Sequence, residues 1–92
     1  MTISICRATQ RDLEEVVPLF DAYRQFYEQP SAPEETRAFL QARLTQDDSV
    51  LFLARNGSQP VGFTQLYPSW SSVRLRRVWI LNDLYVAQHA RR

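Results

Sequence analysis

The feature that most constrains this 92-residue chain is a long apolar segment near its end, residues 75–86. In a regular strand, successive side chains of this segment would point to opposite faces of the sheet, so Asn82 would lie on one face and Asp83 on the other. We expect this segment to be the longest strand of the protein. Because only six residues follow Val86, we also expect it to lie at a sheet edge with its outer side uncovered. An exposed apolar edge of this kind can pair with another chain.

Two segments in the first half of the chain have the three-to-four residue spacing of apolar positions that is typical of helices. Thr9 and Asp12 resemble a capping box that opens the first one, and Pro18 should kink it by removing a backbone donor. Its apolar side is expected to hold Leu13, Val16, Val17, Phe20, Tyr23 and Tyr27, and its water side Asp12, Glu14, Glu15 and Asp21.

Residues 29–31 should end the first helix, because a proline follows a polar residue there. Ser31 and Glu34 predict a capping box for the second helix, and Pro33 suits its first turn. A short apolar stripe then runs to about Gln46; it consists of Phe39, Leu40 and Leu44.

Three shorter segments are predicted to be strands. Residues 3–7 alternate, and residues 50–54 are apolar throughout, as in a strand that is covered on both faces. After an Asn56-Gly57 turn, residues 61–67 should return as a hairpin strand that ends at Pro68. The order strand-helix-helix-strand-strand-strand predicts an α/β (α+β mixed) domain over residues 1–92, with both helices packed on a mainly antiparallel sheet.

Composition excludes several classes of protein. Apolar residues make up 45% and charged residues 23% of the chain, as in ordinary globular proteins, and a net charge of +1 gives no reason to expect a polyanionic partner. No apolar run reaches the roughly 18 residues that span a bilayer. The start lacks the features of a signal peptide, so we expect a cytoplasmic protein without a membrane partner. Cys6 is the single cysteine, and its place in an alternating strand favours a small buried filler over a reactive thiol.

The most informative polar residues are Asn82 and Asp83, because both lie inside an apolar strand. A buried amide or carboxylate without a partner costs free energy, so such a pair needs an explanation. One explanation is a site that holds or deprotonates a substrate at the middle of the sheet. The other is a structural pair with satisfied hydrogen bonds, or a β-bulge.

A weaker candidate is the segment that carries Arg74, Arg76 and Arg77 beside Trp70 and Trp79. Its cationic and aromatic side chains could bind nucleic acid, but the near-zero net charge of the chain favours a solvated strand edge.

The single histidine, His89, has no second ligand or nucleophile near it in the sequence, which argues against a metal site or a catalytic triad. Tyr23, Phe26 and Tyr27 form an aromatic patch at helical spacing. Most such patches belong to a core, although the far end of this one could line an acceptor pocket.

Four stretches together resemble the first half of a GCN5-related N-acetyltransferase (GNAT). They are residues 5–9 with Asp12, residues 61–63, residues 81–87, and the Arg91-Arg92 pair. Within that family the chain is most similar to the diamine (spermidine/spermine-type) and HPA2-like enzymes. The resemblance covers essentially the whole chain.

The resemblance implies that an acetyl group passes from acetyl-CoA to an amine. It also implies that the pantetheine arm of the cosubstrate bonds to backbone groups of the last strand, which by position belong to Leu84, Tyr85 and Val86. A backbone N–H there could polarise the thioester carbonyl. Arg91 and Arg92 stand where the family's glycine-containing turn begins, which binds the pyrophosphate at a helix N-terminus.

The chain departs from the family in two places. It ends before the glycines of the pyrophosphate turn, which we interpret as a shortened chain with weak or absent turnover. Asn82 occupies a position where diamine-type members carry glutamate. An alkyl ammonium with a pKa near 10 must lose a proton before it attacks, and asparagine cannot accept that proton. We therefore assign Asn82 to orienting the amine or a water molecule and keep Asp83 as a candidate base.

The acceptor would be a small amine or a protein lysine, lined by Tyr23, Tyr27 and Tyr67 together with Asn82. An alternative function is a non-catalytic half-domain whose exposed last strand pairs with a second copy, as a homodimer, or with a complementary polypeptide. No metal site is expected.

Overall fold

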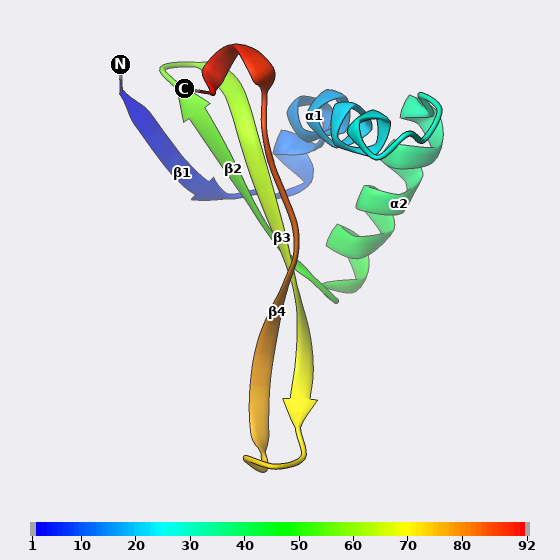
Figure 1. Cartoon of the computed structure of the whole chain (residues 1–92), viewed down its shortest axis with the longest axis vertical. Coiled ribbons are helices and arrows are strands. Elements are labelled where there is room, and N and C mark those ends of the chain that lie inside the picture. The colour runs from blue at the N-terminus through cyan, green and yellow to red at the C-terminus, as the bar shows by residue number, and fades with distance from the viewer. Residues whose placement is uncertain (1, 92) are drawn as a thin grey trace.

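The computed structural model describes residues 2–91 and has the expected order of elements (Figure 1). The elements are β1 (Ile3–Arg7), a 3₁₀ turn (Gln10–Asp12), α1 (Leu13–Phe26), α2 (Pro33–Gln46), β2 (Val50–Asn56), β3 (Gln59–Ser71), β4 (Arg76–Val86) and a second 3₁₀ turn (Gln88–Ala90). The strands form one antiparallel sheet in the order β1-β2-β3-β4, and the two helices lie on one side of it. The predicted α+β architecture is confirmed.

The hydrophobic core lies between the sheet and the two helices. Val16 of α1, Leu40 of α2 and Leu53 of β2 have no exposed surface. Phe63 of β3 stacks on Phe20 of α1, with ring centroids 5.1 Å apart. The predicted apolar stripe of α1 is thus confirmed from Leu13 to Phe20, whereas Tyr23 is half-buried and Tyr27, which follows the helix, is 65% exposed.

The junction between the helices differs from the prediction at two residues. Asp21 was expected to face water, yet it is only 7% exposed. Its carboxylate accepts hydrogen bonds from the Ser31 hydroxyl at 2.6 Å, the Ala32 backbone N–H at 2.7 Å and the Gln25 amide at 3.0 Å. Ser31 therefore does not cap α2, whose N-cap is Ala32 without a side-chain bond. The capping box that Thr9 forms with Asp12 is confirmed.

The two middle strands, β2 and β3, are longer than predicted, and β2 is less covered. In β2 only Leu51 and Leu53 are buried, and they alternate with half-buried residues, so the prediction of two covered faces is wrong. β3 does not end at Pro68 but continues through Trp70 to Ser71, which replaces the predicted loop. β2 pairs with β3 only as far as Leu66, so the rest of β3 has one free edge. Pro68, which has no backbone N–H, is tolerated at that edge.

β4 lies at an edge of the sheet among the described residues, as expected. It begins at Arg76, because Leu75 belongs to the turn and has a φ of 55°. The part of the β3–β4 hairpin between Tyr67 and Asn82, residues 68–81, extends beyond both helices (Figure 1), and we call it the free ribbon.

Cys6 is exposed, so its prediction as a buried filler is wrong. All of β1 is exposed, because this strand lies at the other edge of the sheet. The Arg55 guanidinium donates to the Cys6 sulfur at 3.3 Å.

Gly62 allows β4 to approach β3 closely beside the site. A Cβ atom on Gly62 would lie 2.8 Å from the backbone oxygen of Tyr85, which is closer than such atoms can come. The absence of a side chain at Gly62 therefore sets the position of the C-terminal end of β4.

Candidate functional site

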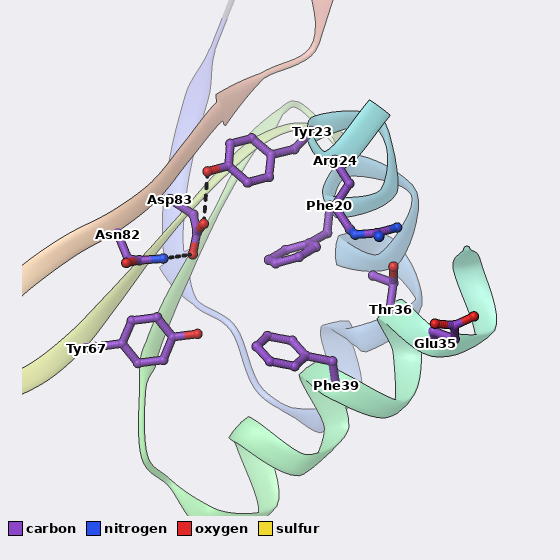
Figure 2. A pocket seen from close by; sticks show the side chains of 9 residues that line it. All are labelled: Phe20, Tyr23, Arg24, Glu35, Thr36, Phe39, Tyr67, Asn82 and Asp83. Atoms are coloured by element: carbon purple, nitrogen blue, oxygen red, sulfur yellow. Dashed lines mark hydrogen bonds between the residues drawn. The ribbon is translucent and has the colours of Figure 1, made fainter. Parts of the chain in front are cut away.

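A β-bulge at Asn82 determines where the polar residues of β4 point. Gln65 pairs with Asp83 and Leu66 pairs with Leu81, so Asn82 is an extra residue without a partner on β3. The bulge interrupts the alternation, and the side chains of Asn82 and Asp83 line the same pocket (Figure 2). Regular alternation would have pointed them to opposite faces, but the β-bulge, one of the two structural explanations considered for this pair, is present, and one inserted residue changes the face of every residue after it.

The pocket lies between the two helices and the β3–β4 hairpin and has a volume of about 450 Å³. Aromatic rings form most of its wall, and Asp83 and Asn82 lie on the sheet side (Figure 2). The residues that line it are Phe20, Tyr23, Arg24, Glu35, Thr36, Phe39, Tyr67, Asn82 and Asp83. A largely apolar cavity with a few convergent polar groups is typical of a site for a small ligand.

Asp83 is the central polar group of this pocket and is only 8% exposed. Its Oδ1 atom accepts a hydrogen bond from the Tyr23 hydroxyl at 2.9 Å. Its Oδ2 atom accepts from the Gln65 amide at 3.0 Å and from the Asn82 amide at 3.1 Å. All three donors are neutral, and no arginine or histidine of residues 2–91 forms a salt bridge with Asp83.

The two tyrosines of the pocket stay protonated at neutral pH. Burial, followed by the hydrogen bond to Asp83 and the charge of Asp83, raises the pKa of Tyr23 to about 12. Burial also raises the pKa of Tyr67, again with a contribution from the Asp83 carboxylate. Tyr23 therefore acts as a hydrogen-bond donor that stabilises the charge on Asp83.

The helix side of the pocket carries one charge of each sign, from Arg24 and Glu35. Arg24 is partly engaged, because its guanidinium donates to the Pro30 carbonyl at 3.1 Å and lies 4.0 Å from Asp21. The Thr36 hydroxyl has no hydrogen-bond partner although Thr36 is 3% exposed.

A second cavity of about 370 Å³ adjoins the first at the C-terminal end of β4. It is lined by Tyr23, Phe26, Tyr27, Leu84, Tyr85, Val86 and Arg91. Arg91 lies across the end of β4, since its Nε donates to the Val86 carbonyl at 2.7 Å and its guanidinium lies 5.3 Å from the Tyr85 ring centroid. The residues expected to bind the cosubstrate are thus brought together, except Arg92, which lies outside the described residues.

The predicted acceptor residues divide between the two cavities. Tyr23, Tyr67, Asn82 and Asp83 share the first one, whereas Tyr27 lines only the second. Sequence reasoning missed Gln65, which contacts Asp83 from below the pocket. The signal that pointed to Asn82 and Asp83, a polar residue inside an apolar strand, also applies to Gln65.

The weaker candidates stay apart from this site. Arg77 lies over the Trp70 ring at 5.0 Å on the free ribbon, and His89 is exposed and lies 3.3 Å from the Gln59 amide. Among residues 2–91, no group of three or more potential ligands is arranged to hold a metal ion. Neither helix within those residues combines the length and apolarity needed to cross a membrane.

Comparison with known proteins identifies the family. The model of the acetyltransferase (GNAT) family matches residues 15–92. The chain belongs to the GNAT family. This GNAT chain is 46% identical over 89 residues to YhfO, an uncharacterized N-acetyltransferase of Bacillus subtilis (strain 168), a match that covers 97% of the chain and 60% of YhfO.

Solved GNAT structures agree with the fold described above. The crystal structure of a probable acetyltransferase matches with a TM-score of 0.91 and 50% identity, over 97% of this chain and 60% of that protein. A predicted acetyltransferase from Clostridium acetobutylicum, crystallised with acetyl-CoA, has the same fold at a TM-score of 0.72 and 14% identity, over 98% of this chain and 63% of that one. The chain therefore spans about 60% of the length of YhfO and of the probable acetyltransferase.

Proposed function

We propose that this chain contributes the acceptor site of an enzyme that transfers an acetyl group from acetyl-CoA to a primary amine. The observation that carries the proposal is the Asp83 carboxylate, which lies in an aromatic-walled pocket without a cationic partner among residues 2–91. A buried carboxylate in this state favours a bound cation, because the cation supplies the missing opposite charge. An alkyl ammonium fits, since aromatic faces also attract cations.

The proposed reaction requires the amine to lose a proton before it attacks. The nitrogen lone pair forms a bond to the thioester carbonyl carbon, the carbon–sulfur bond breaks, and CoA leaves as a thiolate that takes up the second proton, which the nitrogen loses as the amide forms. Asp83 is the candidate acceptor for the ammonium proton, directly or through water. Asn82 shares the pocket with Asp83 and serves to orient the amine.

Acetyl-CoA is proposed to bind along the outer edge of β4. Leu84, Tyr85 and Val86 line a cavity next to the acceptor pocket, and this edge has no strand partner in the described part of the chain. An extended pantetheine arm can use such unpaired backbone groups as a further strand would. Arg91 already donates to the Val86 carbonyl, so an arm that uses this oxygen either takes its second lone pair or displaces the Arg91 side chain.

The acceptor class follows from the pocket walls. Rings at Phe20, Phe39 and Tyr67 suit the methylene groups of a diamine, as the family resemblance implies, or those of a protein lysine.

The exposed thiol of Cys6, which is not part of a disulfide, fits the reducing cytoplasm, which is our proposed location.

The cosubstrate proposal is tested by titrating the ¹⁵N-labelled chain with acetyl-CoA and recording amide shifts. We expect the largest shifts at Leu84, Tyr85 and Val86. Adenosine 3′,5′-diphosphate is the matched control ligand, because it lacks the pantetheine arm and should leave these amides unchanged. Shifts confined to other strands would contradict the proposal.

A second proposal is a homodimer formed through the free edge of β4. It rests on the exposure of large apolar residues along that strand, which include Trp79 at 57%, Leu81 at 58% and Leu84 at 62%. Light scattering with size exclusion tests it. A dimer that persists when acetyl-CoA is added favours this interaction role, whereas a monomer stabilised by acetyl-CoA excludes it.

A further inference from the structure

Gln65 is the one polar residue among the largest fully buried side chains, and it lies directly beneath the acceptor pocket. It has no exposed surface and is not part of the pocket lining. An amide in such a place costs free energy unless both of its ends find partners. The partners of Gln65 therefore indicate what the residue does.

Both ends of the Gln65 amide are satisfied. Its Nε2 donates to Oδ2 of Asp83 at 3.0 Å, and its Oε1 accepts from the hydroxyl of Ser49 at 2.9 Å. Ser49 is 7% exposed and immediately precedes β2. If the amide were reversed, its carbonyl oxygen would face the Asp83 carboxylate, which repels it. Because the Asp83 carboxylate only accepts, it turns the donor end of the Gln65 amide toward itself, and the Ser49 hydroxyl satisfies and anchors the other end.

This arrangement holds the Asp83 carboxylate without neutralising it. A carboxylate can accept about four hydrogen bonds, and Gln65, Asn82 and Tyr23 supply three of them. An arginine in place of Gln65 would cancel the charge, whereas the neutral amide leaves the full negative charge available to the pocket.

We propose that Gln65 and Ser49 are positioning residues that fix the Asp83 carboxylate as the binding point for the ammonium group of the acceptor. The inference rests on the proposed function only in taking the acceptor to be an amine. A purely structural role for the same bonds, as a tie between β2, β3 and β4, would affect unfolding but not the preference of the pocket for a cation.

Two probes of equal shape separate these roles. Benzylamine carries an ammonium group and benzyl alcohol carries a neutral hydroxyl, and both fit an aromatic-walled pocket. Their affinities are measured from the ¹⁵N shifts of Asn82 and Asp83 in the 92-residue chain. We expect the unaltered chain to bind benzylamine more tightly, and equal affinities would overturn the proposal.

Gln65→Met keeps the length of the side chain but removes its donor. We expect it to weaken benzylamine binding roughly 10-fold, the effect of one hydrogen bond to a charged group, and to leave benzyl alcohol binding unchanged. Gln59→Met is the matched control, since Gln59 is exposed at the start of the same strand, six positions before the residue that pairs with Asp83. A Gln65→Met chain with the full cation preference would refute the role of Gln65.

Ser49 provides a second test that does not depend on how well Gln65→Met folds. Ser49→Ala should lower benzylamine affinity about 3-fold, because Oε1 of Gln65 then loses its partner and the side chain that holds Asp83 is less firmly fixed. Ser49→Thr keeps the hydroxyl and should restore the affinity. If both variants bind benzylamine alike, the positioning role of Ser49 is wrong. Because acetyl-CoA takes no part in these titrations, their outcome is independent of cosubstrate binding.

Discussion

The two parts of the β3–β4 hairpin on either side of Asn82 are built from the same pair of strands and yet differ in almost every physical property. The upper part, which contains Phe63, Gln65 and Asp83, packs under α1, and these three residues are at most 8% exposed. The free ribbon has no helix over it, and Trp70 and Trp79 are 68% and 57% exposed there. The backbone pairing is continuous across both parts apart from the bulge.

The difference teaches that strand composition does not decide burial in this protein. The free ribbon is rich in large apolar residues, whereas the buried part carries an amide and a carboxylate. What differs is the helical layer, which covers one part of the hairpin only (Figure 1). Polar groups can be held in fixed positions where that layer excludes water.

The largest test of this comparison makes the same substitution on the free ribbon and in the part of the sheet that the helices cover, at Leu53 of β2, which pairs with Phe63 of the hairpin. Leu53→Ala, at a position with no exposed surface, should lower the free energy of unfolding by about 3 kcal/mol, through lost burial and a cavity. Leu81→Ala on the free ribbon, where the side chain is 58% exposed, is the matched control. Chemical denaturation measures both changes. Equal losses would break the distinction between the two regions.

A second test removes a charge that holds the helical layer together. Asp21→Asn should lower the free energy of unfolding by about 2 kcal/mol at neutral pH, because three donors lose a charged partner. The hydrogen bond from Ser31 is the largest of the causes that hold the pKa of Asp21 below its ordinary value of 3.8. The stabilisation by the Asp21 carboxylate is thus fully present above pH 3.8, the pKa of the unfolded chain, and is lost as the pH falls through the lower pKa of the folded protein.

The measurement is a set of urea unfolding curves at neutral and acidic pH. Glu28→Gln is the control, since Glu28 is an exposed acid that follows α1. The stability difference between Asp21→Asn and the unaltered chain should shrink toward low pH. A difference that does not depend on pH would mean that the charge of Asp21 is not the cause.

The smallest expected effect concerns the phenol of Tyr23. Burial and Asp83 together raise the pKa of Tyr23 to about 12, so Asp83→Asn should lower that pKa toward 10.0 without reaching it. Between these values the native phenol keeps a proton that the unfolded chain has released, so stability falls as pH rises from about 10 to about 12. Absorbance at alkaline pH follows the titration, and Tyr67→Phe simplifies the signal. An unchanged pKa would show that Asp83 does not act on Tyr23.

Local patterns predicted most of the architecture. The alternation in residues 3–7, the helical stripe that includes Val16 and Phe20, and the turn at Gly57 each depend on neighbours in sequence, and each is confirmed. Asn82 and Asp83 were selected for the same reason, because polar residues inside an apolar strand are visible without a structure.

The predictions that failed depend on what packs against a residue. Asp21 has the helical spacing of a solvated position, but the segment between the helices folds back over it. Cys6 alternates like a buried residue, but no element covers β1. Pro68 marks a strand end only where both edges of the strand are paired, and here one edge is free.

The sequence by itself determined the order of the elements, the core face of α1 and the two polar residues of β4, because these follow from short-range periodicity. Tertiary structure decided that Asn82 and Asp83 share one pocket, since a one-residue bulge against β3 cannot be seen in β4 alone. It also decided that Gln65 and Ser49 support Asp83, because residues on separate strands meet only when the sheet forms. The polar side chains of the site are therefore visible in the sequence, but only the pairing of the strands and the packing of the helices on the sheet bring them together.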